Sequence, residues 1–222
     1  FTDEKFNISN SKKYISNNEF SYIYDLLKTS DLKKNMFVFE VNSKKKIVLI
    51  SIKKDLKIFD VENLGAEFYG RINYGKNSEY YINSDSVIGR HENFIGHFLH
   101  GLKLKSYEFN KYKTKKETRL ISINVLGNKI RPSNQNQLKF KALEVGTFYA
   151  RDLVSEPGNI LHPDEYAKRL NSLKKDGLKI NIYDEKKLKK LGMNALLGVG
   201  MGSTRGSYLV TMEWNGAKNN SK

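Results

Sequence analysis

Apolar residues in this chain repeat with two alternating periods, and this alternation restricts the fold more than any other feature of the sequence. Runs at 36–41 and 47–52 are apolar enough for strands, and the lysine-rich turn between them predicts a β-hairpin. Apolar residues spaced three or four apart at 59–72 and 86–102 predict amphipathic helices. Strands that alternate with helices indicate an α/β fold.

The same alternation continues along the rest of the chain. Further helices are expected at 19–27, 136–154, 163–176 and 185–191, and further strands at 80–82, 120–125, 178–183 and 208–212. Pro157 and Gly158 end the long helix, because proline disfavours helical backbone in the residue before it and glycine permits the turn. Pro163 suits the first turn of the next helix, Gly177 its end, and Asp184 a cap. We interpret the long helix as a bridge between two domains.

Composition excludes several classes of protein. The 222 residues contain no cysteine, so disulfides, thiolate metal sites and cysteine nucleophiles are excluded. No apolar run approaches the roughly 20 residues that span a bilayer, and the start lacks the pattern of a signal peptide. We therefore expect a soluble, cytoplasmic protein. Because the chain starts at Phe1 rather than at methionine, we expect its true N-terminus to be missing or processed.

The chain is strongly basic, with a formal net charge of +15 from 39 Lys and Arg against 24 Asp and Glu. One interpretation is a binding module for nucleic acid or another polyanion. The other is a lysine-rich composition without a specific partner, which we favour because Lys and Asn are abundant along the whole chain. The densest basic stretch, 103–119, also carries aromatic residues that could stack on bases or anchor the segment to the core. It contains Lys103, Lys105, Tyr107, Phe109, Lys111, Tyr112, Lys113, Lys115, Lys116 and Arg119.

Three of the four histidines, His91, His97 and His100, lie in one expected helix. Residues three apart share a helix face, so His97 and His100 could bind a metal together. The glutamate of the metalloprotease arrangement is absent between them, and no third ligand is evident nearby. Structural or surface histidines are therefore the favoured interpretation.

The glycines at 198–202 suggest a phosphate-binding loop, since such loops offer backbone N–H groups to anions. The Gly-Lys-Ser/Thr of a P-loop does not follow them, and the spacing differs from the dinucleotide fingerprint. We expect a tight loop between packed elements instead. The Ser, His and Asp residues are scattered, and no nucleophile elbow is present.

Three segments resemble the leucyl aminopeptidase (cytosol aminopeptidase) family. The first is Ala150-Arg-Asp-Leu-Val-Ser-Glu-Pro-Gly-Asn-Ile-Leu-His-Pro-Asp-Glu-Tyr166, where a long helix ending in Ala-Arg-Asp-Leu meets a Pro-started helix. The second is Leu191-Gly-Met-Asn-Ala-Leu-Leu-Gly-Val-Gly-Met-Gly-Ser203 with Tyr208-Leu-Val-Thr-Met-Glu-Trp-Asn-Gly216. The third is Gly101-Leu-Lys-Leu-Lys-Ser-Tyr-Glu-Phe-Asn-Lys-Tyr-Lys-Thr-Lys115. Ser155, Gly158 and Met201 depart from the commoner family residues, at positions that we interpret as structural turns.

The resemblance implies an enzyme that releases N-terminal amino acids, leucine-type, from peptides. Members pair an N-terminal α/β domain with a catalytic domain that holds two divalent metal ions, typically zinc, manganese or magnesium, and they assemble as hexamers. A water that bridges the metals attacks the scissile carbonyl. The family's metal ligands come from a Lys followed by Asp-Thr-Gly-Gly and from an Asn-Thr-Asp-Ala-Glu-Gly-Arg segment. Neither motif occurs in this sequence.

We therefore expect an N-terminal mixed-sheet α/β domain at 1–134, a bridging helix at 135–157, and an incomplete start of the peptidase domain at 158–222. Because the ligand motifs are absent, we assign no catalytic, cofactor-binding or metal-binding residues. The chain on its own is expected to bind no catalytic metal and to be inactive. The two metal ions and the hexamer belong to the full-length enzyme, with peptides as its substrates. A natural inactive subunit is a less favoured alternative.

Overall fold

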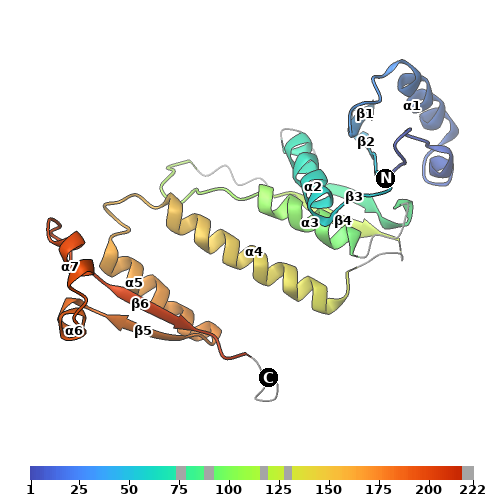
Figure 1. Cartoon of the computed structure of the whole chain (residues 1–222). Helices are drawn as coiled ribbons and strands as arrows, with labels where there is room; N and C mark the ends of the chain where they lie inside the picture. Colours follow the sequence, from blue (N-terminus) through green and yellow to red (C-terminus); the bar gives the residue numbers. More distant parts are fainter. Residues whose placement is uncertain (74–78, 88–92, 116–119, 128–131, 217–222) are drawn as a thin grey trace. The chain divides into compact units, whose positions relative to one another are not determined.

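The chain divides into two compact units, and a computed structural model describes each of them (Figure 1). The first unit covers Phe1–Ala150 and the second covers Arg151–Lys222. The structure describes residues 1–73, 79–87, 93–115, 120–127 and 132–216. Within these ranges every helix is too short or too polar to span a bilayer.

The first unit begins with a short 3-10 turn, η1 (Ser9–Lys13), and helix α1 (Asn17–Thr29). Ser16 and Glu19 form a reciprocal capping box at the start of α1, which satisfies two backbone N–H groups that have no partner within the helix. Strands β1 (Met36–Asn42) and β2 (Lys45–Ile50) form the expected hairpin, paired antiparallel. A small core joins α1 to this hairpin. Its buried members are Phe6, Ile8, Ile23, Leu27, Phe39 and Leu49.

Helices α2 (Ile58–Ile72) and α3 (Phe94–Lys105) pack closely because glycines lie at their contact. A Cβ on Gly65 of α2 would lie 1.9 Å from the carbonyl oxygen of Phe98 on α3. Conversely, a Cβ on Gly101 of α3 would lie 1.9 Å from the carbonyl oxygen of Glu62 on α2. The backbone of each helix therefore occupies the space that a side chain at the facing glycine of the other helix would need.

The helix expected over 86–102 starts later than predicted. Ser86 ends a 3-10 turn, η2 (Ser84–Ser86), and α3 begins at Phe94, while residues 88–92 lie outside the described part. Asn93 precedes α3 in the left-handed conformation, at φ 56°. A right-handed helix cannot continue through such a residue, so the apolar spacing alone placed the start too early.

Strands β3 (Glu79–Asn83) and β4 (Ser122–Leu126) pair in parallel, with α3 between them in the sequence. Together with the antiparallel hairpin, they give the first unit strands of both orientations in two small sheets. A second core joins these elements to α2 and α3. Its buried members are Met36, Ile50, Ile52, Val61, Leu64, Phe68, Ile72, Ile82, Val87, Phe94, Ile95, Phe98 and Leu102. The α/β class expected from the sequence is confirmed.

The long helix expected over 136–154 is present as α4 (Asn134–Ser155), which runs across the point where the two units divide. The spacing of apolar residues in the sequence predicts that Leu138 and Val145 lie on the packed face of this helix, but their exposed fractions are 69% and 62%. Instead, Phe140 and Phe148 contact rings from α3 and the segment after it. The role of α4 as a bridge between domains stays a prediction.

The second unit contains α5 (Pro163–Asn171), η3 (Ser172–Asp176), β5 (Lys179–Tyr183), α6 (Glu185–Lys190), α7 (Asn194–Gly200) and β6 (Leu209–Glu213). Strands β5 and β6 pair antiparallel. Ala167, Leu170, Ile180 and Leu188 are buried. Ile180 lies between two exposed neighbours, in agreement with the alternation of apolar and polar residues along this strand. The expected caps are confirmed: Pro163 starts α5, and the Asp184 carboxylate accepts from the N–H of Lys187 at 2.9 Å.

Candidate functional site

The two described histidines of α3 form separate pairs with glutamates from neighbouring helices. Nδ1 of His97 lies 2.9 Å from Oε1 of Glu62 on α2, and Nδ1 of His100 lies 3.0 Å from Oε1 of Glu144 on α4. Both imidazole rings contact the ring of Phe140, with centroids 4.9 and 5.1 Å away. His97 and His100 therefore link α3 to its neighbouring helices. His91 lies outside the described residues.

No group of three or more His, Cys, Asp or Glu side chains in the described part of the chain is arranged to hold a metal ion. The described residues therefore do not fit the two-metal centre that the family resemblance implies. We assign no reaction step to them. The expectation that this chain contributes no catalytic or metal-binding residue stays a prediction.

The glycines at 198–202 lie at the end of α7 and just beyond it, rather than in a loop between packed elements. Val199 and Met201 are 89% and 85% exposed, and a Cβ on Gly198 would meet nothing within 4 Å. The segment is thus exposed within its unit, which corrects the expectation. Only Gly200 is crowded, because a Cβ there would lie 2.1 Å from Oγ of Ser207.

In the basic stretch at 103–119, which begins in the last turn of α3, aromatic residues pack within the first unit. The ring of Tyr107 contacts Phe148 of α4 at 5.2 Å between centroids, and Phe109 contacts Tyr112 at 5.8 Å. The ammonium of Lys103 also lies over the ring of Phe148, at 5.9 Å. These contacts favour the interpretation of an anchored segment. Lys116 and Arg119, the last basic residues of the stretch, lie outside the described residues.

A charged cluster lies at the start of the second unit. The side chain of Glu156 is only 1% exposed, and Nη1 of Arg169 donates a hydrogen bond to its Oε1 at 2.8 Å. Nε of Arg169 donates to Oε1 of Glu165, one helical turn earlier on α5, at 3.0 Å. These two carboxylates raise the pKa of Arg169, Glu156 having the larger effect, so the guanidinium stays charged.

A second pair of contacts extends this cluster. His162 and Asp164 are joined by a hydrogen bond, and Nη1 of Arg205 lies 3.7 Å from Oδ2 of Asp164. From the sequence, Asp164 and Glu165 are expected only as acids that suit the first turn of a helix, and Glu156 has no evident partner. Glu165 and Arg169 are four residues apart on α5, and this spacing could have predicted their ion pair. No spacing in the sequence predicts the pair of Glu156 with Arg169, because these residues lie on different elements.

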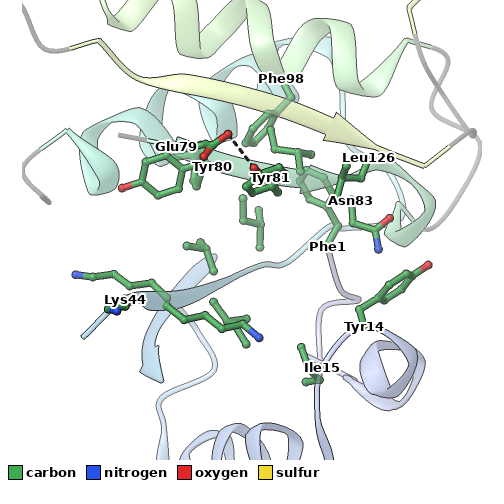
Figure 2. Close-up of a pocket in the computed structure, with 17 residues that line it drawn as sticks. Phe1, Tyr14, Ile15, Lys44, Glu79, Tyr80, Tyr81, Asn83, Phe98 and Leu126 are labelled. Carbon is green, nitrogen blue, oxygen red and sulfur yellow. Dashed lines mark hydrogen bonds between the residues drawn. The ribbon is translucent and has the colours of Figure 1, made fainter. Parts of the chain in front are cut away.

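The first unit contains a cavity of about 760 Å³ between the hairpin and β3 (Figure 2). Phe1 and Asn83 lie at one end, and Lys44 and Tyr80 lie toward the other. Within the lining, the hydroxyl of Tyr81 donates a hydrogen bond to Oε1 of Glu79 at 2.8 Å. The lining comprises Phe1, Tyr14, Ile15, Lys44, Lys45, Lys46, Ile47, Val48, Ile50, Phe68, Glu79, Tyr80, Tyr81, Ile82, Asn83, Phe98 and Leu126.

The amino group of Phe1 donates a hydrogen bond to Oγ of Ser86 at 2.8 Å, and burial lowers its pKa from 8.0 to about 6. Between pH 6 and pH 8 the amino group of Phe1 is protonated to a greater extent in the unfolded chain than in the folded chain. The free energy of unfolding should therefore rise from pH 6 to pH 8. The rise is at most ~2.7 kcal/mol. Urea unfolding of the 222-residue chain at both pH values checks this. A chain acetylated at its N-terminus is the control and should lack this rise in the free energy of unfolding. Equal pH dependence of the two chains would contradict the prediction.

Comparison with known proteins identifies the second unit more closely than its geometry does. The family model described as "Cytosol aminopeptidase family, catalytic domain" matches residues 148–222. A probable cytosol aminopeptidase of Nitrobacter winogradskyi is 33% identical over 180 residues, which is 78% of this chain and 36% of that protein. The chain belongs to the cytosol aminopeptidase family. The matched range starts inside α4 and contains the Glu156–Arg169 cluster.

Two solved structures share the fold of this chain. A mutant of tomato leucine aminopeptidase superposes with a TM-score of 0.73 at 18% identity, over 88% of this chain and 42% of that one. The bottromycin maturation enzyme BotP, solved in complex with Mn, gives a TM-score of 0.68 at 17% identity, over 85% and 41%. The chain spans about a third or less of the length of the curated family relatives that it matches.

Proposed function

We propose that the protein to which this chain belongs is a metal-dependent aminopeptidase that releases N-terminal amino acids, leucine-type, from peptides. The observation that carries the proposal is the match of residues 148–222 to the catalytic domain of the cytosol aminopeptidase family. In this proposal the first unit is the N-terminal domain. Helix α4 leads into the second unit, which forms the opening of the catalytic domain.

We expect the whole enzyme to use two divalent metal ions, zinc or manganese, and the BotP structure with Mn supports metal dependence within this fold. The metal ions would supply an activated water and polarise the scissile carbonyl. The described residues offer no ligand set for these ions, so we propose a structural role for these residues. Arg169 holds the buried Glu156 and thereby fixes the turn between α4 and α5.

The test compares two purified proteins: the product of the complete reading frame that contains these residues, and the 222-residue chain. Each is incubated with a leucine anilide in the presence of Mn²⁺ or Zn²⁺, with and without a chelator. We expect the complete product to release leucine only when metal is present. The 222-residue chain should release none above the blank, because the family's ligand motifs are absent from it.

Two outcomes would overturn parts of this proposal. If the complete product released no leucine with any of the metals, the assignment as a leucine-type aminopeptidase would be wrong. If the 222-residue chain released leucine by itself, the catalytic centre would lie within it, against our expectation. A catalytically inactive natural subunit would show the first outcome together with correct folding by circular dichroism.

Three further features are proposed for the complete enzyme. We propose that it assembles as a hexamer, which light scattering of the complete product would test. We propose a cytoplasmic location, as the name of the relatives suggests, and cell fractionation checks it. Weak polyanion binding, from the net charge of +15, should weaken steeply with salt. Reversing the charges of Lys111 and Lys113 should reduce that binding, and unchanged binding would exclude this segment as its source.

A further inference from the structure

Strand β1 has one edge that no other strand covers. It pairs with β2 on one side, in regular antiparallel register from Met36 to Glu40. Among the described residues its other edge has no strand partner, and its backbone forms no hydrogen bond outside the hairpin. An open edge presents backbone N–H and C=O groups that can pair with the backbone of another chain. The free edge of β1 is therefore a candidate docking site.

The features that usually keep an edge strand from pairing are sparse along β1. Natural edges are protected by charged side chains, prolines and bulges. β1 contains no proline and no lysine, and Glu40 is its one charged residue. Its irregular pairing with β2 lies between Glu40 and Asn42, so the stretch 36–40 is regular. In the middle of this stretch Val38 is apolar and yet 41% exposed.

The stretch 36–40 is complementary to itself when a second copy pairs with it antiparallel. If Val38 lies opposite Val38 of the second copy, then Phe37 of each copy lies opposite Phe39 of the other. Cross-strand pairs of aromatic and of β-branched residues stabilise a sheet. A centre at Phe39 would instead bring the irregular end of the strand into the pair. We therefore favour the register centred on Val38.

One charged contact supports the same register. Met36 would lie opposite Glu40 of the second copy, and Lys34 precedes Met36 by two residues, so it would lie diagonally from that carboxylate. Diagonal neighbours on one face of a sheet are within reach of long side chains. Lys34 is exposed and forms no ion pair among the described residues. A second copy would thus offer a carboxylate to an ammonium group that has none.

Helix α1 fits this arrangement as well. It packs over both strands of the hairpin, because Ile23 and Leu27 share a core with buried residues of β1 and β2. If two hairpins joined through β1, their centres would lie two strand spacings apart, roughly 9.6 Å. Packed helices lie about 8–10 Å apart, so the two copies of α1 would meet. α1 has exposed apolar surface, at Tyr22 (46%) and Leu26 (37%), for such a contact.

We propose that two copies of this chain associate through β1, edge to edge and antiparallel, so that two hairpins form one four-stranded sheet around a twofold axis at Val38. Only residues of the first unit take part, so this proposal does not depend on the assignment as an aminopeptidase. A contact of this size gives a weak and reversible dimer. Because each chain carries a net charge of +15, the copies repel each other, and salt should strengthen the dimer by screening that repulsion.

The experiment uses the absence of cysteine from the chain, because one introduced thiol then reports which residues meet. Val38→Cys places the thiols of two copies opposite each other, where facing Cβ atoms are about 4.5–5.5 Å apart. Glu40→Cys is the matched control on the same face of the same strand. Its two thiols would lie four residues apart along the sheet, roughly 13 Å, which is too far for a disulfide. Both 222-residue variants are treated with a mild thiol oxidant, and covalent dimer is followed on non-reducing gels.

We expect Val38→Cys to form covalent dimer roughly tenfold or more faster than Glu40→Cys, because only the first pair of thiols is within bonding reach. Circular dichroism checks that both variants fold, and both positions are exposed in the structure. Equal rates would overturn the proposal, since random collisions do not distinguish the two positions. Faster dimer formation by Glu40→Cys would also overturn it, since the axis would then not lie at Val38.

Sedimentation equilibrium of the unaltered 222-residue chain tests the same proposal without any substitution. We expect a monomer–dimer equilibrium that shifts toward the dimer as sodium chloride is raised. A chain that stays monomeric at every concentration and salt would overturn the proposal, and the edge of β1 would then be open only to a different partner. Association that weakens with salt would overturn it too, because such a contact would depend on opposite charges.

Discussion

Replacing Gly65 by alanine should destabilise the first unit by about 3 kcal/mol or more. The new methyl group would lie 1.9 Å from the carbonyl oxygen of Phe98, and backbone atoms cannot move away by a change of rotamer. Helices α2 and α3 would have to separate, which loosens the core around Phe98, a fully buried side chain. Gly101→Ala should act in the same way through the carbonyl of Glu62. Chemical denaturation followed by circular dichroism measures the loss.

Gly70 provides the matched control on the same helix. A Cβ at this position would meet nothing within 4 Å. Gly70→Ala should therefore stabilise the chain by ~0.5–1 kcal/mol, because alanine loses less backbone entropy in a helix. If Gly65→Ala were as well tolerated as Gly70→Ala, the close approach of α2 and α3 would be wrong.

Replacing Arg169 by methionine should cost the second unit about 3–5 kcal/mol. The substitution removes the guanidinium that pairs with Glu156, whose side chain is 1% exposed, and a buried carboxylate that loses its partner is strongly unfavourable. Methionine keeps much of the aliphatic bulk, so the loss reports charge pairing more than packing. Unfolding followed by the fluorescence of Trp214, the single tryptophan of the sequence and a residue of this unit, measures it.

Lys168 is the control for this second prediction. It neighbours Arg169 on α5 and forms an ion pair with Glu165 at 3.7 Å, but its side chain is 81% exposed. An exposed pair of this kind contributes about 0–1 kcal/mol, so Lys168→Met should change the free energy of unfolding little. Similar losses for the two variants would show that Glu156 does not depend on Arg169. The prediction would then be wrong.

Local patterns in the sequence predicted the elements of this fold well. The hairpin, α2 and the strand β5 follow from the spacing of apolar residues, and the end of η3 at Gly177 follows from its left-handed conformation at φ 93°. Family membership was also predicted from short segments, which the comparisons confirm. Each of these features depends on residues that are close in sequence.

Features that depend on distant residues were not predicted. The packing face of α4 was misassigned because Phe140 is buried by the histidines of α3, a contact that no periodicity within α4 reveals. The left-handed Asn93 shortened a helix whose apolar spacing was otherwise regular. The pair of Glu156 with Arg169 and the cavity between the hairpin and β3 arise only after the chain has folded.

The parallel pairing of β3 with β4 has a consequence for the order of folding. The β1–β2 hairpin closes a short turn, whereas β3 and β4 lie about forty residues apart in sequence and can meet only by closing a long loop around α3. Contacts between distant residues form slowly. We therefore expect the wall of the cavity formed by β2 to form earlier than the wall formed by β3.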